Sequence, residues 1–337
     1  MSNLRLISCL LASLLIPLAA AQAQDHSAHM HHEHGASVPE MDAEGKRLAS
    51  YQVKHDMDAA TLAALREKIA LYRGMTDMEL NMNMSAMGPN YEWYASDPAL
   101  EGSIGVLILS HGVGENSDRI MKEALAPVSG RYPTAIGFGM AMMQSAYLQT
   151  AVDDLIARGA ETIVLVPNGT TTEYNTLTRQ WKYIFDIGNE EATYLEVPKI
   201  RSDAEFVMTS HFADSQLITD ILYDHVKEVS TDPANEVVII VGHGPEDIED
   251  NEPDLEILQA HVDRIAGKGE FADVRIINLQ DDAIPPVRES NVRKLRRWVK
   301  QAGSRGQTPI VVALAAASHG VQSHMKADLR GLDYVFA

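Results

Sequence analysis

The sequence predicts an α/β protein built from two related halves, each with a mainly parallel sheet flanked by helices. First, apolar runs long enough for buried strands alternate with segments of helical periodicity, which is the pattern of βαβ units. Second, an apolar run followed by His-Gly occurs twice, over residues 104–112 and 237–244. Third, a length of 337 residues favours two domains over one.

In the first half, helical periodicity is clearest over Leu148–Arg158, which Gly159 ends. A fourth apolar stretch near 205–209 is followed by a helix to about Val229. The expected strands of this half lie at about 104–110, 133–138 and 161–167.

The second half repeats this scheme after Asp232-Pro233, a dipeptide that favours a turn and marks the joint between the halves. The expected strands lie at about 236–242, 273–279 and 309–316, with helices at 254–266 and 288–301. The halves therefore span residues 102–232 and 233–337.

Residues 1–23 have the pattern of a secretory signal peptide. Arg5 provides the positive charge, an apolar run follows, and Ala21-Gln22-Ala23 is an A-x-A cleavage site. We expect cleavage after Ala23 and a periplasmic mature protein. No other segment approaches the roughly 20 apolar residues of a membrane helix, so we expect no stable membrane insertion. The only cysteine, Cys9, leaves with the signal, and its surroundings resemble a lipoprotein box placed unusually early.

Residues 24–58 are polar and of low complexity, and we expect a disordered leader. Five histidines crowd its start: His26, His29, His31, His32 and His34. They favour weak, exchangeable binding of Cu, Ni, Co or Zn, with an inert linker as the alternative.

Residues 59–101 combine a helix expected at 61–72 with a methionine cluster. This cluster is either an amphipathic core stripe or a thioether site for Cu(I). Its members are Met75, Met78, Met82, Met84 and Met87.

The chain is acidic, with 47 Asp and Glu against 28 Lys and Arg. Nucleic acids bind basic surfaces, so the composition argues against them as the main partner. A negative field instead favours solubility and attracts cations.

Histidines at strand ends carry the strongest chemical signal. His243 closes the first strand of the second half, and the third strand leads through Ser318-His319-Gly320 to His324 and Asp328. Ligands of open α/β sheets bind beyond the carboxyl ends of the strands. If these two strands are neighbours, His243 and His324 converge on one metal site. An i, i+4 spacing lets Asp328 orient the imidazole or share the cation.

Other histidines have weaker claims to this role. His111 closes the corresponding strand of the first half, and His211 follows its fourth apolar stretch. For every single histidine the alternative is a surface or core residue without a ligand.

These residues resemble those of the sirohydrochlorin cobalt/iron chelatases, the class II tetrapyrrole chelatases. The shared pattern is an apolar strand with Gly-His-Gly, then a strand, small residues and Gly-x-x-x-His-x-x-x-Asp. The ending, Gly331-Leu-Asp-Tyr-Val-Phe336, and the segment 151–167 are also similar. The resemblance covers about 102–337 and implies two chelatase-like halves that face a cleft.

The resemblance also implies an activity: insertion of a divalent metal (Co, Fe or Ni) into a tetrapyrrole by a lyase. Two histidines would bind the metal and take up pyrrole protons, here His243 and His324. An acidic residue at the end of the middle strand corresponds to Asp281 or Asp282. In the first half, the segment where the resemblance places a second histidine is 168–175, which contains none. The resemblance therefore favours a single active centre, in the second half.

Carboxylate-rich macrocycles call for cationic anchors. Arg293, Arg297 and Lys300 fall on one face of the expected helix 288–301, and the alternative is a solvated surface. Two functions follow from the sequence. The protein is a chelatase-like enzyme that inserts or handles metal in a sirohydrochlorin-type tetrapyrrole, or a non-catalytic periplasmic protein that binds metal or tetrapyrrole. The metal, the macrocycle and the oligomeric state stay open.

Overall fold

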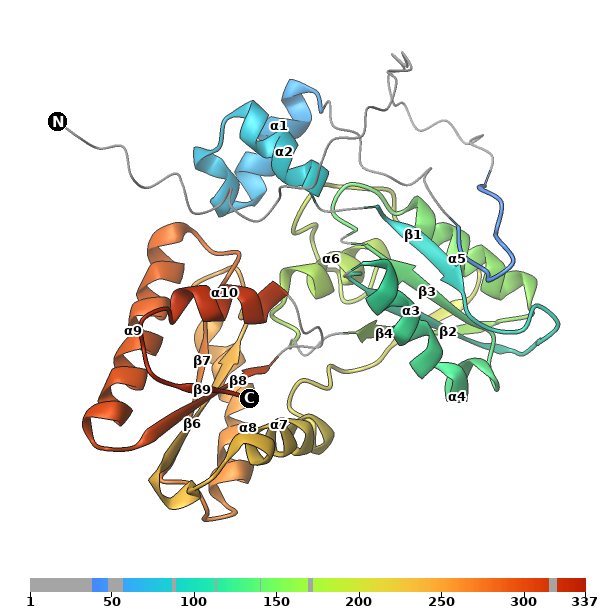
Figure 1. The fold of residues 1–337 in the computed structure, drawn as a ribbon. Coiled ribbons are helices and arrows are strands. Elements are labelled where there is room, and N and C mark those ends of the chain that lie inside the picture. Colours follow the sequence, from blue (N-terminus) through green and yellow to red (C-terminus); the bar gives the residue numbers. More distant parts are fainter. Residues whose placement is uncertain are drawn as a thin grey trace. The chain divides into compact units, whose positions relative to one another are not determined.

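The computed structural model describes residues 38–47, 57–86, 89–112, 114–139, 141–168, 172–314 and 320–337. These residues form an α/β protein with two mainly parallel sheets flanked by helices, as the sequence predicts (Figure 1). Residues 39–337 belong to one compact unit. Among the described helices, none is both long and apolar enough to cross a membrane.

The first sheet has the strand order β1-β3-β2-β4-β5, and only β1 is antiparallel to its neighbour. Its strands are β1 (Tyr91–Tyr94), β2 (Ile104–Ser110), β3 (Thr134–Phe138), β4 (Thr162–Asn168) and β5 (Glu205–Met208). The helices that follow these strands are α3 (Glu115–Ala124), α4 (Ala126–Ser129), α5 (Ala146–Ala157), α6 (Thr176–Ile184) and α7 (Gln216–Val229).

The second sheet is parallel throughout, with the order β7-β6-β8-β9. After the short helix η2 (Pro233–Asn235), its strands are β6 (Glu236–Gly242), β7 (Asp273–Asn278), β8 (Thr308–Leu314) and β9 (Val335–Phe336). Its helices are α8 (Asn251–Ala266), α9 (Pro285–Ser304) and α10 (Gly320–Asp328). Because β6 pairs with both β7 and β8, the first and third strands of this half are neighbours, as expected.

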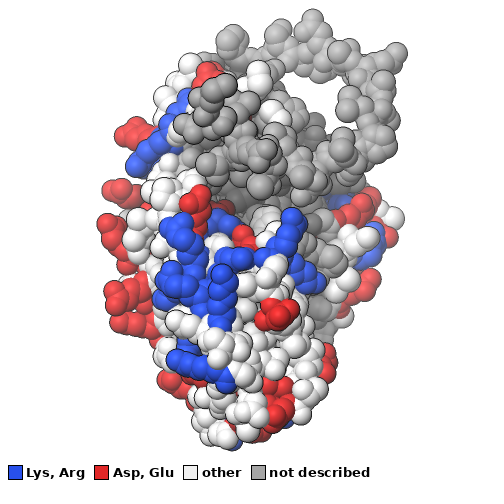
Figure 2. Space-filling model, turned by 60° about the vertical axis from the view of Figure 1, so that its left-hand side comes forward, with Lys and Arg blue, Asp and Glu red and all other residues white. Residues whose placement is uncertain are grey.

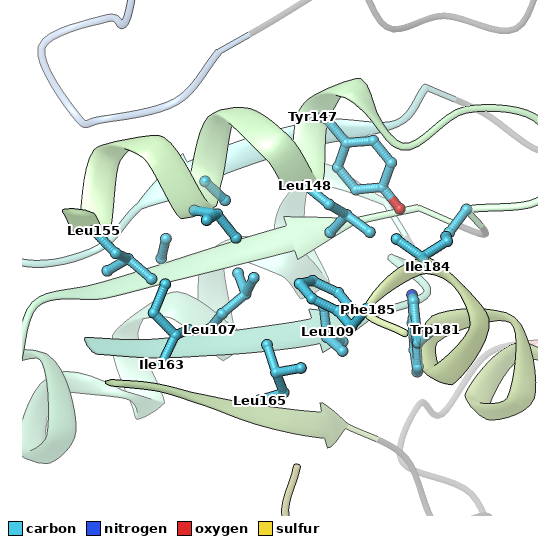
Figure 3. Close-up of a cluster of buried hydrophobic side chains, with 14 of the residues drawn as sticks. Leu107, Leu109, Tyr147, Leu148, Leu155, Ile163, Leu165, Trp181, Ile184 and Phe185 are labelled. Atoms are coloured by element: carbon cyan, nitrogen blue, oxygen red, sulfur yellow. The ribbon is translucent and has the colours of Figure 1, made fainter. Parts of the chain in front are cut away.

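The core of the first half lies between its sheet and the helices α5 and α6. Leu148 and Leu155 of α5 and Trp181 of α6 pack on strand residues such as Leu107 and Leu165 (Figure 3). Gly105 in β2 lets α5 approach closely, because a Cβ there would lie 3.3 Å from the Cβ of Leu155. The opposite face of the sheet carries the aromatic cluster of Tyr91, Trp93 and Phe138.

Helix α7 precedes the expected joint at Asp232-Pro233 but packs on the second sheet. Its residues Leu222 and Val226 share a buried cluster with Val238 and Ile240 of β6. The second hydrophobic core therefore begins near Ala213, earlier along the chain than the sequence suggested.

The expected helix at 61–72 is two shorter elements, α1 (Ala59–Lys68) and the 3₁₀-helix η1 (Ala70–Gly74). Ile69 is extended and ends α1. Asp58 caps the helix, because its Oδ1 accepts a 2.7 Å hydrogen bond from the Thr61 amide.

Helix α2 (Asp77–Ala86) shows that the methionine cluster is only partly a core stripe. Met84 is 1% exposed and packs with Leu80 and Tyr194, whereas Met78 is 73% and Met82 58% exposed. Met75 is partly buried against the same cluster. Met87 lies outside the described residues.

Residues 39–47, which the sequence placed in a disordered leader at 24–58, make specific contacts with the first half. Arg47 is buried and donates hydrogen bonds to Glu92 and Asp154, and Lys46 forms an isolated β-bridge with Trp93. Composition could not reveal these contacts, because the partners lie far along the chain. The histidines at 26–34 and residues 48–56 lie outside the described residues.

Candidate metal-binding site at His243

His243 stands directly after the last residue of β6, in a turn that Gly244 makes with φ of +79°. Its Nδ1 lies 2.9 Å from the carbonyl oxygen of Gly244. A carbonyl only accepts hydrogen bonds, so Nδ1 carries the proton in the neutral ring. The lone pair of that ring is then on Nε2, the atom free to bind a metal or a further proton.

Carboxylates from the end of β7 lie beside this nitrogen. His243 Nε2 is 3.4 Å from Asp282 Oδ2, and the Asp281 amide donates to the His243 carbonyl at 3.3 Å. Burial alone would lower the pKa of His243, but the charges of Asp282 and Asp281 outweigh it and raise that pKa. The pair therefore favours a positive charge between ring and carboxylate, either a proton or a metal cation.

Asp328 has a different partner from the one expected. Its carboxylate accepts hydrogen bonds from Arg288 near the start of α9, with Nη2 to Oδ2 at 2.8 Å. His324 lies one turn earlier on α10, with an exposed side chain. Because β6 and β8 are adjacent and parallel, His243 and α10 both follow strands that end at the same sheet edge. Residues 315–319, with His319, lie outside the described residues.

A small pocket adjoins His243 between the ends of β6, β7 and β8. Asn278 in its wall is buried, and its Oδ1 has no hydrogen-bond partner within the described structure. A Cβ on Gly242 would lie 2.4 Å from that oxygen, so glycine is needed there. The lining residues are Asn175, Gly242, His243, Gly244, Pro245, Asp254, Leu258, Asn278 and Leu314.

The donors present suit a divalent transition metal bound loosely. Imidazole and carboxylate ligands are compatible with Co, Fe, Ni and Zn. Within the described ranges, no three His, Cys, Asp or Glu side chains are grouped so that they could hold a metal ion. His243 and Asp282 alone would leave most coordination positions open, which suits an ion that must be passed on.

The first half contributes to this region through the segment that replaces its second histidine. Thr172 donates a hydrogen bond to Asp254 in the first turn of α8, and Asn278 Nδ2 donates to the same carboxylate at 2.7 Å. Arg179 Nη1 lies 2.8 Å from Asp250, just before α8. Burial raises the pKa of Asp254, against the effect of the two hydrogen bonds. The sequence did not reveal Thr172, Asp254 and Asn278 as members of this region, because single polar residues give no local pattern.

His111 repeats the backbone geometry of His243 without its carboxylates. Its Nδ1 also contacts the carbonyl of the following glycine, Gly112, which has φ of +77°. The ring is exposed, and no Asp or Glu in the described part of the chain forms an ion pair with it. The repeated sequence thus encodes a repeated turn, but among the described residues only the second imidazole forms an ion pair with a carboxylate.

His211 belongs to a separate polar cluster. Its Nε2 lies 3.0 Å from Glu173 Oε2, and its Nδ1 is 3.7 Å from Asp214 Oδ1. Nδ1 is buried and makes no hydrogen bond within the described residues.

Arg293, Arg297 and Lys300 are exposed on the outer side of α9, where basic side chains gather (Figure 2). The helix leads from the carboxyl end of β7 back to the amino end of β8. At 1.5 Å per residue, Lys300 lies about 22 Å along the axis from Pro285. Arg293 is the closest of the three to the site end of the helix, and it pairs with Glu289 at 3.4 Å.

No protein-family model matches the chain, and no curated protein matches it. Among solved structures, the chain is similar to SirB from Bacillus subtilis with Fe³⁺, at 14% identity and a TM-score of 0.51. The match covers 70% of this chain and 88% of SirB.

A weaker similarity, with a TM-score of 0.40 and 15% identity, is to DR2241 from Deinococcus radiodurans. That match covers 70% of this chain and 50% of DR2241. DR2241 is described as a multi-domain protein with structural similarity to chelatases and two additional novel domains. With its two parallel-dominated sheets and its similarity to SirB, the chain has a SirB-like fold over the matched part.

Proposed function

We propose that this protein binds a divalent metal at His243 and inserts it into a sirohydrochlorin-type tetrapyrrole. The observation that carries the proposal is the placement of His243 Nε2 at 3.4 Å from Asp282, beyond the carboxyl ends of β6 and β7. The fold shared with SirB, which was solved with Fe³⁺, supports a metal as the substrate. Co, Fe and Ni fit the imidazole and carboxylate donors.

The described residues suit the two requirements of such a reaction. The Gly244 carbonyl orients the His243 ring, so that Nε2 can hold the ion or accept a proton that a pyrrole nitrogen loses. Asp282 stabilises the positive charge in either state. His324 on α10 is the proposed second histidine, and the open coordination positions allow the ion to leave for the macrocycle.

The second candidate is a periplasmic protein that binds metal or tetrapyrrole without turnover. The pairing of Asp328 with Arg288 favours it, because a carboxylate that already bonds to a guanidinium is less available to a metal at His324. The export signal and the histidine-rich leader point the same way.

The test mixes the mature protein, beginning at Gln24, with sirohydrochlorin and Co²⁺ or Fe²⁺ and follows the absorption spectrum of the macrocycle. We expect metal insertion faster than without protein, lost in His243→Ala. His111→Ala is the matched control, since it removes an imidazole that stands in the same kind of turn but forms no ion pair within the described residues. Equal rates in the two variants would exclude a centre at His243. Tetrapyrrole or metal binding without accelerated insertion would establish the second candidate.

A further inference from the structure

We propose that Arg288 is the positioning residue of the His243 site, which holds α10 and its His324 in place against the Asp281–Asp282 loop. The inference rests on the proposed function for its metal readout. The contacts themselves involve only described side chains of α9, α10 and the loop after β7.

Arg288 bridges two carboxylates that come from different elements. Its Nε donates to Asp281 Oδ1 at 2.9 Å, and its Nη2 donates to Asp328 Oδ2 at 2.8 Å. The side chains are partly buried, with exposed fractions of 26% for Arg288, 10% for Asp281 and 17% for Asp328. Charge-assisted hydrogen bonds in such partly shielded places are stronger than those of surface pairs.

Both carboxylates are connected to the proposed metal-binding groups. The Asp281 amide bonds to the His243 carbonyl, and the next residue, Asp282, lies beside His243 Nε2. Asp328 ends α10, one turn after His324. A single guanidinium thus joins the loop that faces His243 to the helix that carries His324.

This bridge also determines which carboxylates remain for a metal. Asp281 and Asp328 share the single charge of Arg288, whereas Asp282 lies beside His243 Nε2. Lysine could not replace arginine, because its ammonium is a single point and cannot span two carboxylates with the rigid fork of a guanidinium.

Arg288→Lys is therefore the decisive variant, since it keeps the charge and removes the fork. Loss of a residue that holds metal ligands in place typically weakens metal affinity about 10–100-fold, and we expect a loss of at least about 10-fold for Co²⁺ by calorimetric titration. Arg293→Lys is the matched control on the same helix, with an exposed pair to Glu289, and should change the affinity less than about twofold. The visible absorption spectrum of bound Co²⁺, which reports its ligand geometry, should change in Arg288→Lys and stay as in the wild type in Arg293→Lys.

A general loosening of α10 must be distinguished from loss of this bridge. Arg296 holds the end of α10 by donating to the backbone carbonyl of Asp328, without contacting Asp281. Arg296→Lys should therefore raise the amide hydrogen exchange of α10 but leave the Co²⁺ spectrum as in the wild type. Asp328→Asn, which removes the other end of the bridge, should reproduce the spectrum of Arg288→Lys.

Failure of the inference and failure of the proposed function give different results. If His243→Ala abolishes Co²⁺ binding and Arg288→Lys binds as the wild type does, the positioning role is overturned and the metal site stands. If His243→Ala binds Co²⁺ normally, the proposed site falls, and the metal role of Arg288 falls with it. Unchanged α10 exchange in metal-free Arg288→Lys would overturn the bridge itself.

Discussion

Gly244 combines two demands that only glycine meets. Its φ is +79°, and a Cβ would lie 2.6 Å from the Cβ of Asn278. Gly306 has a similar φ of +76°, but a Cβ there would have no atom within 4 Å. Its substitution therefore measures the backbone strain of a non-glycine residue without any packing clash. Gly306→Ala should destabilise by about 1 kcal/mol, the cost of a left-handed non-glycine residue. Gly244→Ala should cost about 1–3 kcal/mol more, because packing against Asn278 must also shift.

Urea unfolding of the two glycine variants measures this difference directly. Equal losses would show that Asn278 moves away without cost, and that the wall of the pocket is soft.

Glu92 provides a pH test of the contact between residues 39–47 and the first sheet. Burial and the charge of Asp154 raise the pKa of Glu92 to about 8, although Arg47 opposes them. A folded-state pKa above the unfolded value means that its stabilising contribution is present at low pH. This contribution decreases as the pH rises from the ordinary Glu value, about 4.5, through about 8.

Glu92→Gln removes this titration and keeps the shape of the side chain. The melting temperature of the variant, relative to the wild type, should therefore rise between pH 5 and pH 8. A constant difference across that range would show that Arg47 keeps Glu92 ionised throughout, and the raised pKa would be wrong.

At the residue scale, the sequence placed His243 directly after a strand, where the structure has it, because local order along one strand is visible in the chain. The acidic residue near the end of the middle strand, Asp281 or Asp282, was implied by the family resemblance alone. The roles of Arg288 and Asp254 were not predictable, because each partner comes from another element. Asp328 shows the limit clearly: its i, i+4 spacing to His324 suggested one partner, and the fold supplied Arg288 instead.

At the scale of elements, α2 offers two methionines for a matched comparison. Met84 is buried among Leu80 and Tyr194, and Met82 is exposed on the same helix. Met84→Ala should destabilise by about 2–5 kcal/mol, as large-to-small core changes do. Met82→Ala should stay within about 0.5 kcal/mol of the wild type.

Chemical unfolding followed by far-UV circular dichroism checks the methionine pair. If Met84→Ala hardly changes the free energy of unfolding, α1 and α2 unfold separately from the sheets. In that case the amide exchange rates of these two helices would still be faster in Met84→Ala than in Met82→Ala.

Strands with strong apolar runs were predictable, whereas the order β7-β6-β8-β9 was not predicted beyond the condition that the first and third strands can be neighbours. Strand β1 was not predicted, because its four residues carry no alternation: all four are buried. The placement of α7 was also hidden. Its apolar face is visible in the sequence, but periodicity does not say which of two sheets that face covers.

At the scale of the whole molecule, the N-terminal region makes two predictions, one on export and one on metal binding and stability. We expect the mature chain to begin near Gln24 and to fractionate with the periplasm, which N-terminal sequencing of the cell fractions checks. A finding of intact Met1 in the cytosol would contradict export.

Chains that begin at Gln24, Pro39 and Met57 should differ in metal binding and stability. The step from Gln24 to Pro39 removes the five clustered histidines and should lose several weakly bound ions at an unchanged melting temperature. Coordinating imidazole must be neutral, so this binding should weaken below about pH 6. The step to Met57 removes Arg47 and leaves Glu92 buried without its cation, so the melting temperature should fall.

Calorimetric titration and thermal melts distinguish these outcomes. Equal metal stoichiometry from Gln24 and Pro39 would show that the histidine cluster is a linker. An unchanged melt from Met57 would show that the Arg47 contacts contribute nothing.

The packing of α7 has a consequence for how the chain is made. During synthesis α7 leaves the ribosome directly after the first sheet. The sheet on which α7 packs cannot form until β6, β7 and β8 have also been made. During that interval Leu222 and Val226 face water, which exposes the nascent protein to aggregation or to chaperone capture. Separate expression of the halves cut at residue 232 would make that vulnerable interval permanent.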